Sequence, residues 1–176
     1  FSGAAGAKRI YNVIDQPIKI TNDLSLPDLK PSEGNIKFAN VSFKYENSND
    51  RAVKDINLEI KGGSMAAFVG HSGAGKSTII NLLPRFYDPQ NGEIFIDGQN
   101  TKSVNLNSLR KSISLVSQDV ILFDSTVREN ILYANKDASE KEFLDSCKFA
   151  AAEEFIRDLP EKYETLIGEN GIRLSG

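Results

Sequence analysis

Alternation of apolar and polar positions predicts two antiparallel strands in the first half of the chain. In NIKFANVSFKY, the apolar residues Val41, Phe43 and Tyr45 alternate with polar neighbours, which is the period of a half-buried strand. The polar stretch ENSNDR reads as a turn, and AVKDINLEI alternates again. We therefore expect residues 35–60 to form an antiparallel strand pair.

Two later segments are apolar without alternation. SMAAFV (64–69) and ISLVS (113–117) fit strands that are buried on both faces, as in a parallel sheet. Between them lie the glycine-rich loop GHSGAGKST, a helix in TIINLLPRFY that ends near Pro84, and a short strand in GEIFIDG. The order strand, glycine loop, helix, strand predicts an α/β fold.

Helical spacing dominates both ends of the chain. At the N-terminus, Ala4, Ala7, Tyr11 and Ile14 recur at intervals of three and four, which predicts a short amphipathic helix. The stretch from 16 to 34 contains three prolines and few apolar pairs, as a linker does. We place the domain boundary near its end, so that 1–33 precede a domain over 34–176.

The second half is predicted to be mainly helical. A short helix follows in NLNSLRK, and STVRENILYA starts a helix capped by Ser125 or Thr126. The longest helix is expected in SEKEFLDSCKFAAAEEFIRDL, where Ser139 and Glu142 have the spacing of a capping box.

Composition limits the class of protein. The 176 residues are 40% hydrophobic, enough for one sizeable core, and the net charge of -3 gives no overall field that attracts nucleic acid. Any anion site must therefore be local. Cys147 is the single cysteine, which excludes an internal disulfide and favours a reducing compartment and a core position. Without a long apolar span or signal peptide, we expect a soluble, cytoplasmic segment.

The loop from Gly70 to Ser77 has the spacing GxxxxGK followed by serine, after an apolar run and before a predicted helix. This P-loop motif wraps small residues around a β-phosphate, so that backbone N–H groups can donate to it. Lys76 is predicted to contact the β- and γ-phosphates and Ser77 to bind Mg²⁺. His71 is expected to act through its backbone. The motif alone leaves kinases, GTPases, motors and transporters open.

Beyond the P-loop, the chain resembles the nucleotide-binding domain of an ABC transporter of the exporter type, over nearly its whole length. SQDVILFDSTVRENI is similar to the family's glutamine loop, and YETLIGENGIRLSG to the approach to its LSGGQ signature, here ending after LSG. GENG, SLRKSISLVSQ and TVREN are most similar to the bacterial lipid A flippase and multidrug exporter group. The resemblance implies a P-loop NTPase core with a RecA-like parallel sheet, an antiparallel β subdomain and a partial α-helical subdomain from about residue 119.

The same resemblance implies the site residues. Tyr45 would stack on adenine, Gln118 would contact Mg²⁺ or the attacking water, and Ser175 would cap the γ-phosphate bound by a partner subunit. Lys76 and Gln118 would act in catalysis. The full set implied for ATP and Mg²⁺ comprises Tyr45, Gly70, His71, Ser72, Gly73, Ala74, Gly75, Lys76, Ser77, Thr78, Gln118, Ser175 and Gly176.

Hydrolysis also needs an acidic pair after an apolar strand, and no stretch supplies one. Asp97 is followed by glycine and Asp124 by serine, and the family's switch histidine is missing because His71 lies in the P-loop. We therefore expect this chain to bind ATP weakly and to turn over almost none, whereas its parent would be an ATPase.

The resemblance also implies partners and a location. It predicts a second nucleotide-binding domain in a homodimer or heterodimer, the chain's own transmembrane domain, and no nucleic acid. The parent would lie in the plasma (inner) membrane, with this domain on the cytoplasmic side, and would export a lipid or hydrophobic substrate. A non-transport ABC ATPase of the DNA-repair or translation type, and a nucleotide-binding module without turnover, stay open as alternatives.

Overall fold

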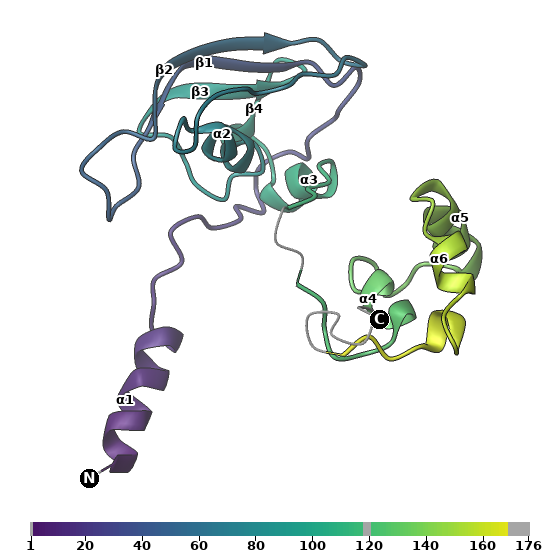
Figure 1. Ribbon diagram of the computed structural model, residues 1–176. Helices are drawn as coiled ribbons and strands as arrows, with labels where there is room; N and C mark the ends of the chain where they lie inside the picture. Colours follow the sequence, from purple (N-terminus) through teal and green to yellow (C-terminus); the bar gives the residue numbers. More distant parts are fainter. Residues whose placement is uncertain (1, 118–120, 169–176) are drawn as a thin grey trace. The chain divides into compact units, whose positions relative to one another are not determined.

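The computed structural model describes residues 2–117 and 121–168, with side chains from residue 6 onward. The chain divides into two compact units, Phe1–Ser114 and Leu115–Gly176 (Figure 1). The first unit contains a sheet and short helices, and the second contains helices. Within the described residues, no helix is both long and apolar enough to cross a bilayer.

The sheet of the first unit is antiparallel throughout its described strands. The predicted strand pair is confirmed as β1 (Ile36–Phe43) and β2 (Val53–Ile60), in register at Phe38 and Leu58. On its other edge, β1 pairs with β3 (Asn91–Ile96), which is followed by β4 (Gln99–Asn100), in the order β2-β1-β3-β4 (Figure 1). The strand predicted in GEIFIDG therefore exists, and its neighbour is an antiparallel strand.

One face of this sheet makes the main core. The helix α2 (Lys76–Leu82) contributes Leu82, which is fully buried in one cluster with Val41 and Ile94. Burying such side chains contributes about 1.5–3 kcal/mol each. The helix ends before Pro84 as predicted, because proline cannot continue the backbone hydrogen bonds.

The two apolar segments predicted to be strands are irregular in the structure. Residues 64–69 and 113–117 pair with none of the described strands, and Met65 and Val116 are 100% and 92% exposed. A parallel strand is stable only when neighbours satisfy its backbone groups, and apolar composition does not supply that neighbour. The strand predictions for these segments are wrong for the described residues.

The predicted linker has no helix or strand, but it is fixed to the first unit. The Asp97 carboxylate, in the turn after β3, accepts backbone hydrogen bonds from Ser32, Glu33, Gly34 and Asn35 at 2.7–3.2 Å. These donors hold the pKa of Asp97 well below its ordinary value. We call this contact the Asp97 anchor.

Further contacts continue the attachment towards the N-terminus. The Gln99 side chain pairs with the backbone of Lys30, and Leu29 is buried. The short helices η1 (Thr101–Ser103) and α3 (Leu106–Lys111) follow β4, and the Leu106 N–H donates to Asn22 Oδ1 at 2.8 Å. The amphipathic helix predicted at the N-terminus is confirmed as α1 (Ser2–Ile14).

The second unit confirms the predicted capping box at Ser139 and shows that Thr126, one of the two predicted caps, also forms such a box. Thr126 and Glu129 cap α4 (Val127–Leu132), and Ser139 and Glu142 cap α5 (Glu140–Phe149). The 3-10 helix η2 (Lys162–Glu164) lies near the end of the described chain.

The single long helix predicted from Ser139 onward is wrong. It stops after Phe149, and a separate helix, α6 (Glu153–Arg157), follows. Ala151 has φ 52°, and hydrogen bonds from Ala151 to Lys148 and from Ala152 to Cys147 make a Schellman motif. The turn lets α6 bury Ile156, and alanine in place of the usual glycine leaves no stop signal in the sequence.

Arg128 connects the helices of this unit. Its guanidinium lies 4.5 Å from the centroid of the Phe143 ring and pairs with Glu140 and Glu164 at 2.7 Å each. Cys147 is buried nearby, as predicted, and burial raises the pKa of its thiol.

Candidate functional site

The predicted phosphate loop joins residue 69 to α2 in a conformation that depends on glycine. Gly73 and Gly75 have φ values of 80° and 82°. A Cβ on Gly75 would lie 2.4 Å from the Ala52 carbonyl oxygen and 2.7 Å from Val53 Cγ1. The loop therefore approaches the start of β2 more closely than any side chain would allow.

Lys76 folds back over this loop. Its Nζ donates to the carbonyl oxygens of Gly70 and His71, both at 2.7 Å. These are neutral partners, and none of the described carboxylates forms an ion pair with Lys76. Within the described part of the chain, the charge on the ammonium is therefore uncompensated, which suits an anionic ligand.

The other loop residues have the exposure that a phosphate site needs. Residues 71–74 are exposed, as is Ser77 in the first turn of α2, whereas Thr78 is buried. His71 contributes its carbonyl oxygen, which accepts from Lys76 and, at 3.2 Å, from the Ala74 N–H. Gln118, Ser175 and Gly176 lie outside the described residues.

Tyr45 lies next to this loop although 33 residues separate it from α2. Its ring is half-buried and packs edge-on against Phe43 and Tyr87, with centroid distances of 4.8 and 5.2 Å. Its hydroxyl lies 3.1 Å from Thr78 Oγ1. The structure thus brings the proposed adenine platform into direct contact with the phosphate-binding helix.

A cavity of about 620 Å³ opens beside Tyr45. Tyr87 and Phe86 line it together with the cations Lys44 and Arg110. Aromatic faces next to positive charges suit a planar, electron-rich group attached to an anion.

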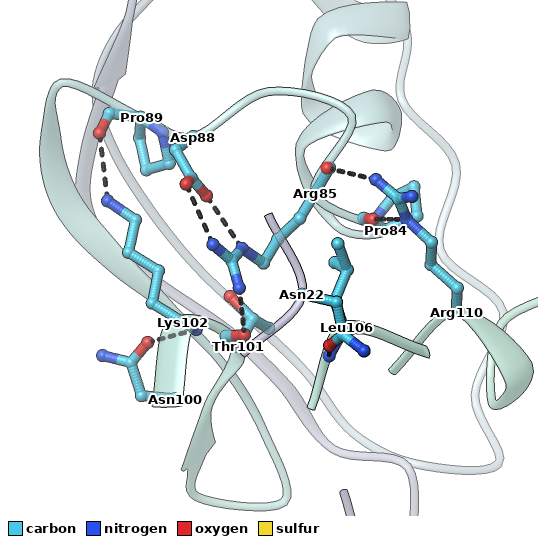
Figure 2. A network of polar contacts seen from close by, with 10 residues as sticks. All are labelled: Asn22, Pro84, Arg85, Asp88, Pro89, Asn100, Thr101, Lys102, Leu106 and Arg110. Carbon is cyan, nitrogen blue, oxygen red and sulfur yellow. Dashed lines mark hydrogen bonds and ion pairs between the residues drawn. The ribbon is translucent and has the colours of Figure 1, made fainter. Parts of the chain in front are cut away.

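The segment between α2 and β3 is fixed by contacts that were not predicted from the sequence. Arg85, which is 9% exposed and has φ 54°, donates to both carboxylate oxygens of Asp88 at 2.9 and 3.0 Å, and to the Thr101 carbonyl oxygen at 3.3 Å (Figure 2). Arg110 donates to the carbonyl oxygens of Pro84 and Arg85 at 3.0 and 2.8 Å.

We call these two side chains the arginine pair. They fix the backbone that carries Tyr87, which in turn packs on Tyr45. Only the Arg85–Asp88 spacing of three residues is visible in the sequence, because the contacts of Arg110 are separated by at least 25 residues.

The described residues contain no cluster of three or more His, Cys, Asp or Glu side chains that would hold a metal ion by themselves. A Mg²⁺ ion bound mainly by phosphates and one hydroxyl needs no such cluster, and the exposed Ser77 fits that requirement. The Asp97 carboxylate is occupied by the Asp97 anchor.

A family model described as ABC transporter matches residues 53–176. The chain belongs to the ABC transporter family. A Staphylococcus aureus protein named as a multidrug export ATP-binding/permease protein is 46% identical over 95% of this chain and 29% of its own length. ABC transporter B family member 2 of Dictyostelium discoideum is 43% identical over 99% of this chain and 13% of its own length.

A solved structure, a bacterial Atm1-family ABC exporter with ATP bound, matches with a TM-score of 0.87 and 39% identity. The match covers 99% of this chain and 30% of the exporter chain. The P-loop NTPase fold and the exporter-type family inferred from the sequence are confirmed. This chain spans less than a third of each of these proteins.

Proposed function

We propose that this chain is the ATP-binding part of an exporter, in which ATP binding and hydrolysis drive a substrate across a membrane. The observation that carries the proposal is the phosphate loop, with the Lys76 ammonium on two carbonyl oxygens of that loop and the Tyr45 ring next to the same helix. Exporter relatives that match nearly the whole chain support the assignment.

Each loop residue then has a specific role. Backbone N–H groups of residues 70–78 bind phosphate oxygens, and Lys76 exchanges its two carbonyl partners for the β- and γ-phosphates. Ser77 and Gln118 would hold Mg²⁺, which would supply positive charge next to the phosphate oxygens. Tyr45 stacks on adenine, which contributes about 1–3 kcal/mol by analogy with nucleobase platforms.

The remaining parts of the proposal concern the whole protein. Residues 1–33 form the end of the last membrane helix and a linker, and 34–176 form an incomplete ATP-binding domain. Ser175 and Gly176 serve the nucleotide of a second such domain. The transmembrane domain lies in the plasma membrane, with this part on the cytoplasmic side. The substrate is a lipid or another hydrophobic molecule; one relative is named for multidrug export.

ATP binding by the 176-residue chain tests the proposal. Wild type and Lys76→Ala are compared by calorimetric titration with MgATP, with Lys37→Ala as the control because Lys37 pairs on the surface with Glu59. A charged hydrogen bond contributes about 1.5–3 kcal/mol, so Lys76→Ala should weaken binding by about 10- to 150-fold and Lys37→Ala by less than about 3-fold.

Phosphate release, measured in the same samples, tests whether a chain without the acidic pair hydrolyses ATP. The chain lacks an acidic pair, and general-base catalysis contributes about 10²- to 10⁴-fold in rate. Release by the wild-type chain should therefore not exceed that of Lys76→Ala, whereas the full-length protein should release phosphate in a Lys76-dependent way. Equal MgATP affinity of the wild type and Lys76→Ala would contradict the nucleotide assignment.

A further inference from the structure

The contact between Tyr45 and Thr78 joins two parts of the proposed nucleotide site that have separate tasks. Tyr45 lies just beyond β1, and Thr78 lies on α2, two residues after Lys76. The two hydroxyl oxygens are 3.1 Å apart, a hydrogen bond in which either can donate. A side-chain bond therefore connects the base platform to the helix that carries the phosphate-binding lysine.

The surroundings leave this hydrogen bond little freedom. Thr78 is 6% exposed and cannot readily exchange its partner for water. The Tyr45 ring meets Phe43 and Tyr87 nearly at right angles, with interplanar angles of 85° and 86°. The aromatic edges set the tilt of the ring, and the Thr78 hydroxyl sets how far the ring extends over α2.

We propose that Thr78 is a positioning residue for base recognition, acting through the Tyr45 hydroxyl. The inference rests on the proposed ATP-binding function and goes beyond it, because the Thr78 hydroxyl would contribute to the recognition of a group that it does not touch. In consequence, phosphate binding at α2 and base stacking on Tyr45 are coupled through the hydrogen bond to Thr78, which adds to the aromatic contacts that hold the ring.

Two ligands separate the base from the phosphates. Affinities for MgATP and for magnesium tripolyphosphate, which has no base or ribose, are measured by calorimetry on the full-length protein. The ratio of the two dissociation constants is the base increment. Stacking of about 1–3 kcal/mol predicts a wild-type base increment of at least about 5-fold.

Single hydroxyl deletions give the direct test. Tyr45→Phe keeps the ring and Thr78→Val keeps the shape, so each removes one half of the hydrogen bond. Each should reduce the base increment by about 2- to 10-fold, the effect of a single hydrogen bond, whereas Thr78→Ser should retain it. The double variant Tyr45→Phe/Thr78→Val should resemble the singles, because both remove the same bond.

A threonine in the second unit supplies the matched control. Thr165 also accepts a hydrogen bond through its hydroxyl, from the Glu161 N–H at 3.1 Å, so Thr165→Val makes the same chemical change at a residue that is not part of the proposed site. It should leave the base increment unchanged even if it lowers the melting temperature. A purely structural role of Thr78 would likewise lower the melting temperature without changing the base increment.

Three results would overturn the inference. The first is that Thr78→Val weakens the binding of MgATP and of magnesium tripolyphosphate by the same factor, because Thr78 would then act on the phosphates alone. Multiplicative effects in the double variant would show that the two hydroxyls act independently. Equal MgATP binding by wild type and Lys76→Ala would remove the nucleotide function itself, and that failure is recognised before any hydroxyl variant is compared.

Discussion

Replacing Arg85 by methionine isolates the contribution of the arginine pair to the fold. The change removes two charged hydrogen bonds to Asp88 and one to the Thr101 carbonyl oxygen. The Asp88 side chain is 31% exposed and can regain water, so we count only about 1 kcal/mol for its share. Thr101 is 2% exposed, and its unpaired carbonyl costs about 1–3 kcal/mol. The expected loss of stability is about 2–4 kcal/mol.

Native-state hydrogen exchange of the β1 and β3 amides measures this loss without assuming that the two units unfold together. A loss of about 2–4 kcal/mol should speed exchange by about 30- to 700-fold. The control is Lys37→Met, which breaks a pair whose side chains are 54% and 70% exposed and should cost less than about 1 kcal/mol. If Arg85→Met and Lys37→Met speed exchange to the same extent, the buried carbonyl bond does not stabilise the sheet.

Three further predictions test other parts of the chain. Asp97→Asn should speed amide exchange in residues 32–35 and leave exchange in α2 unchanged. Because folding lowers the pKa of Asp97, the anchor should stabilise these residues fully above the ordinary pKa of 3.8 and weaken only as the pH falls below it. Faster exchange of residues 32–35 in the wild type already at pH 5 would contradict the anchor. Gly75→Ala should weaken MgATP binding by more than about 10-fold, because the new Cβ would lie 2.4 Å from the Ala52 carbonyl oxygen. Calorimetry should show this loss of affinity, while the amides of α4 keep their hydrogen-exchange rates. Unchanged MgATP affinity would refute the close approach of the loop to Ala52. In a Ser64→Cys variant, a thiol reagent should modify the exposed new thiol at least about 100-fold faster than Cys147, which is buried and whose thiol has a raised pKa. Equal modification rates would exclude a core position for Cys147.

Features encoded by neighbouring residues were the ones the sequence predicted best. The capping box of Ser139 and Glu142 needs only three residues, and the phosphate loop only eight. Alternation predicted β1 and β2 because apolar side chains of both strands share one core cluster with Leu82 of α2. Such signals are complete within a short window and do not depend on the rest of the fold.

Contacts between distant residues were not predictable in the same way. The Asp97 anchor spans 62 to 65 positions, so the prolines predicted a linker but not its attachment to the turn after β3. The break at Ala151 was hidden because alanine favours helix, and tertiary burial of Ile156 outweighs that preference. The apolar run 64–69 had the composition of a buried strand but finds no neighbour among the described strands.

The irregular conformation of residues 64–69 also shows what orders the phosphate loop. Its described contacts come from other parts of the chain and from the loop itself: Gly75 lies against Ala52, Lys76 donates to the loop carbonyls, and Thr78 contacts Tyr45. Leu82 anchors the same helix in the core of the antiparallel sheet. Among the described residues, the proposed ATP site is therefore held by α2 and by the residues that follow β1 and precede β2. Changes that loosen this packing should affect ligand affinity more than changes in the apolar run before Gly70.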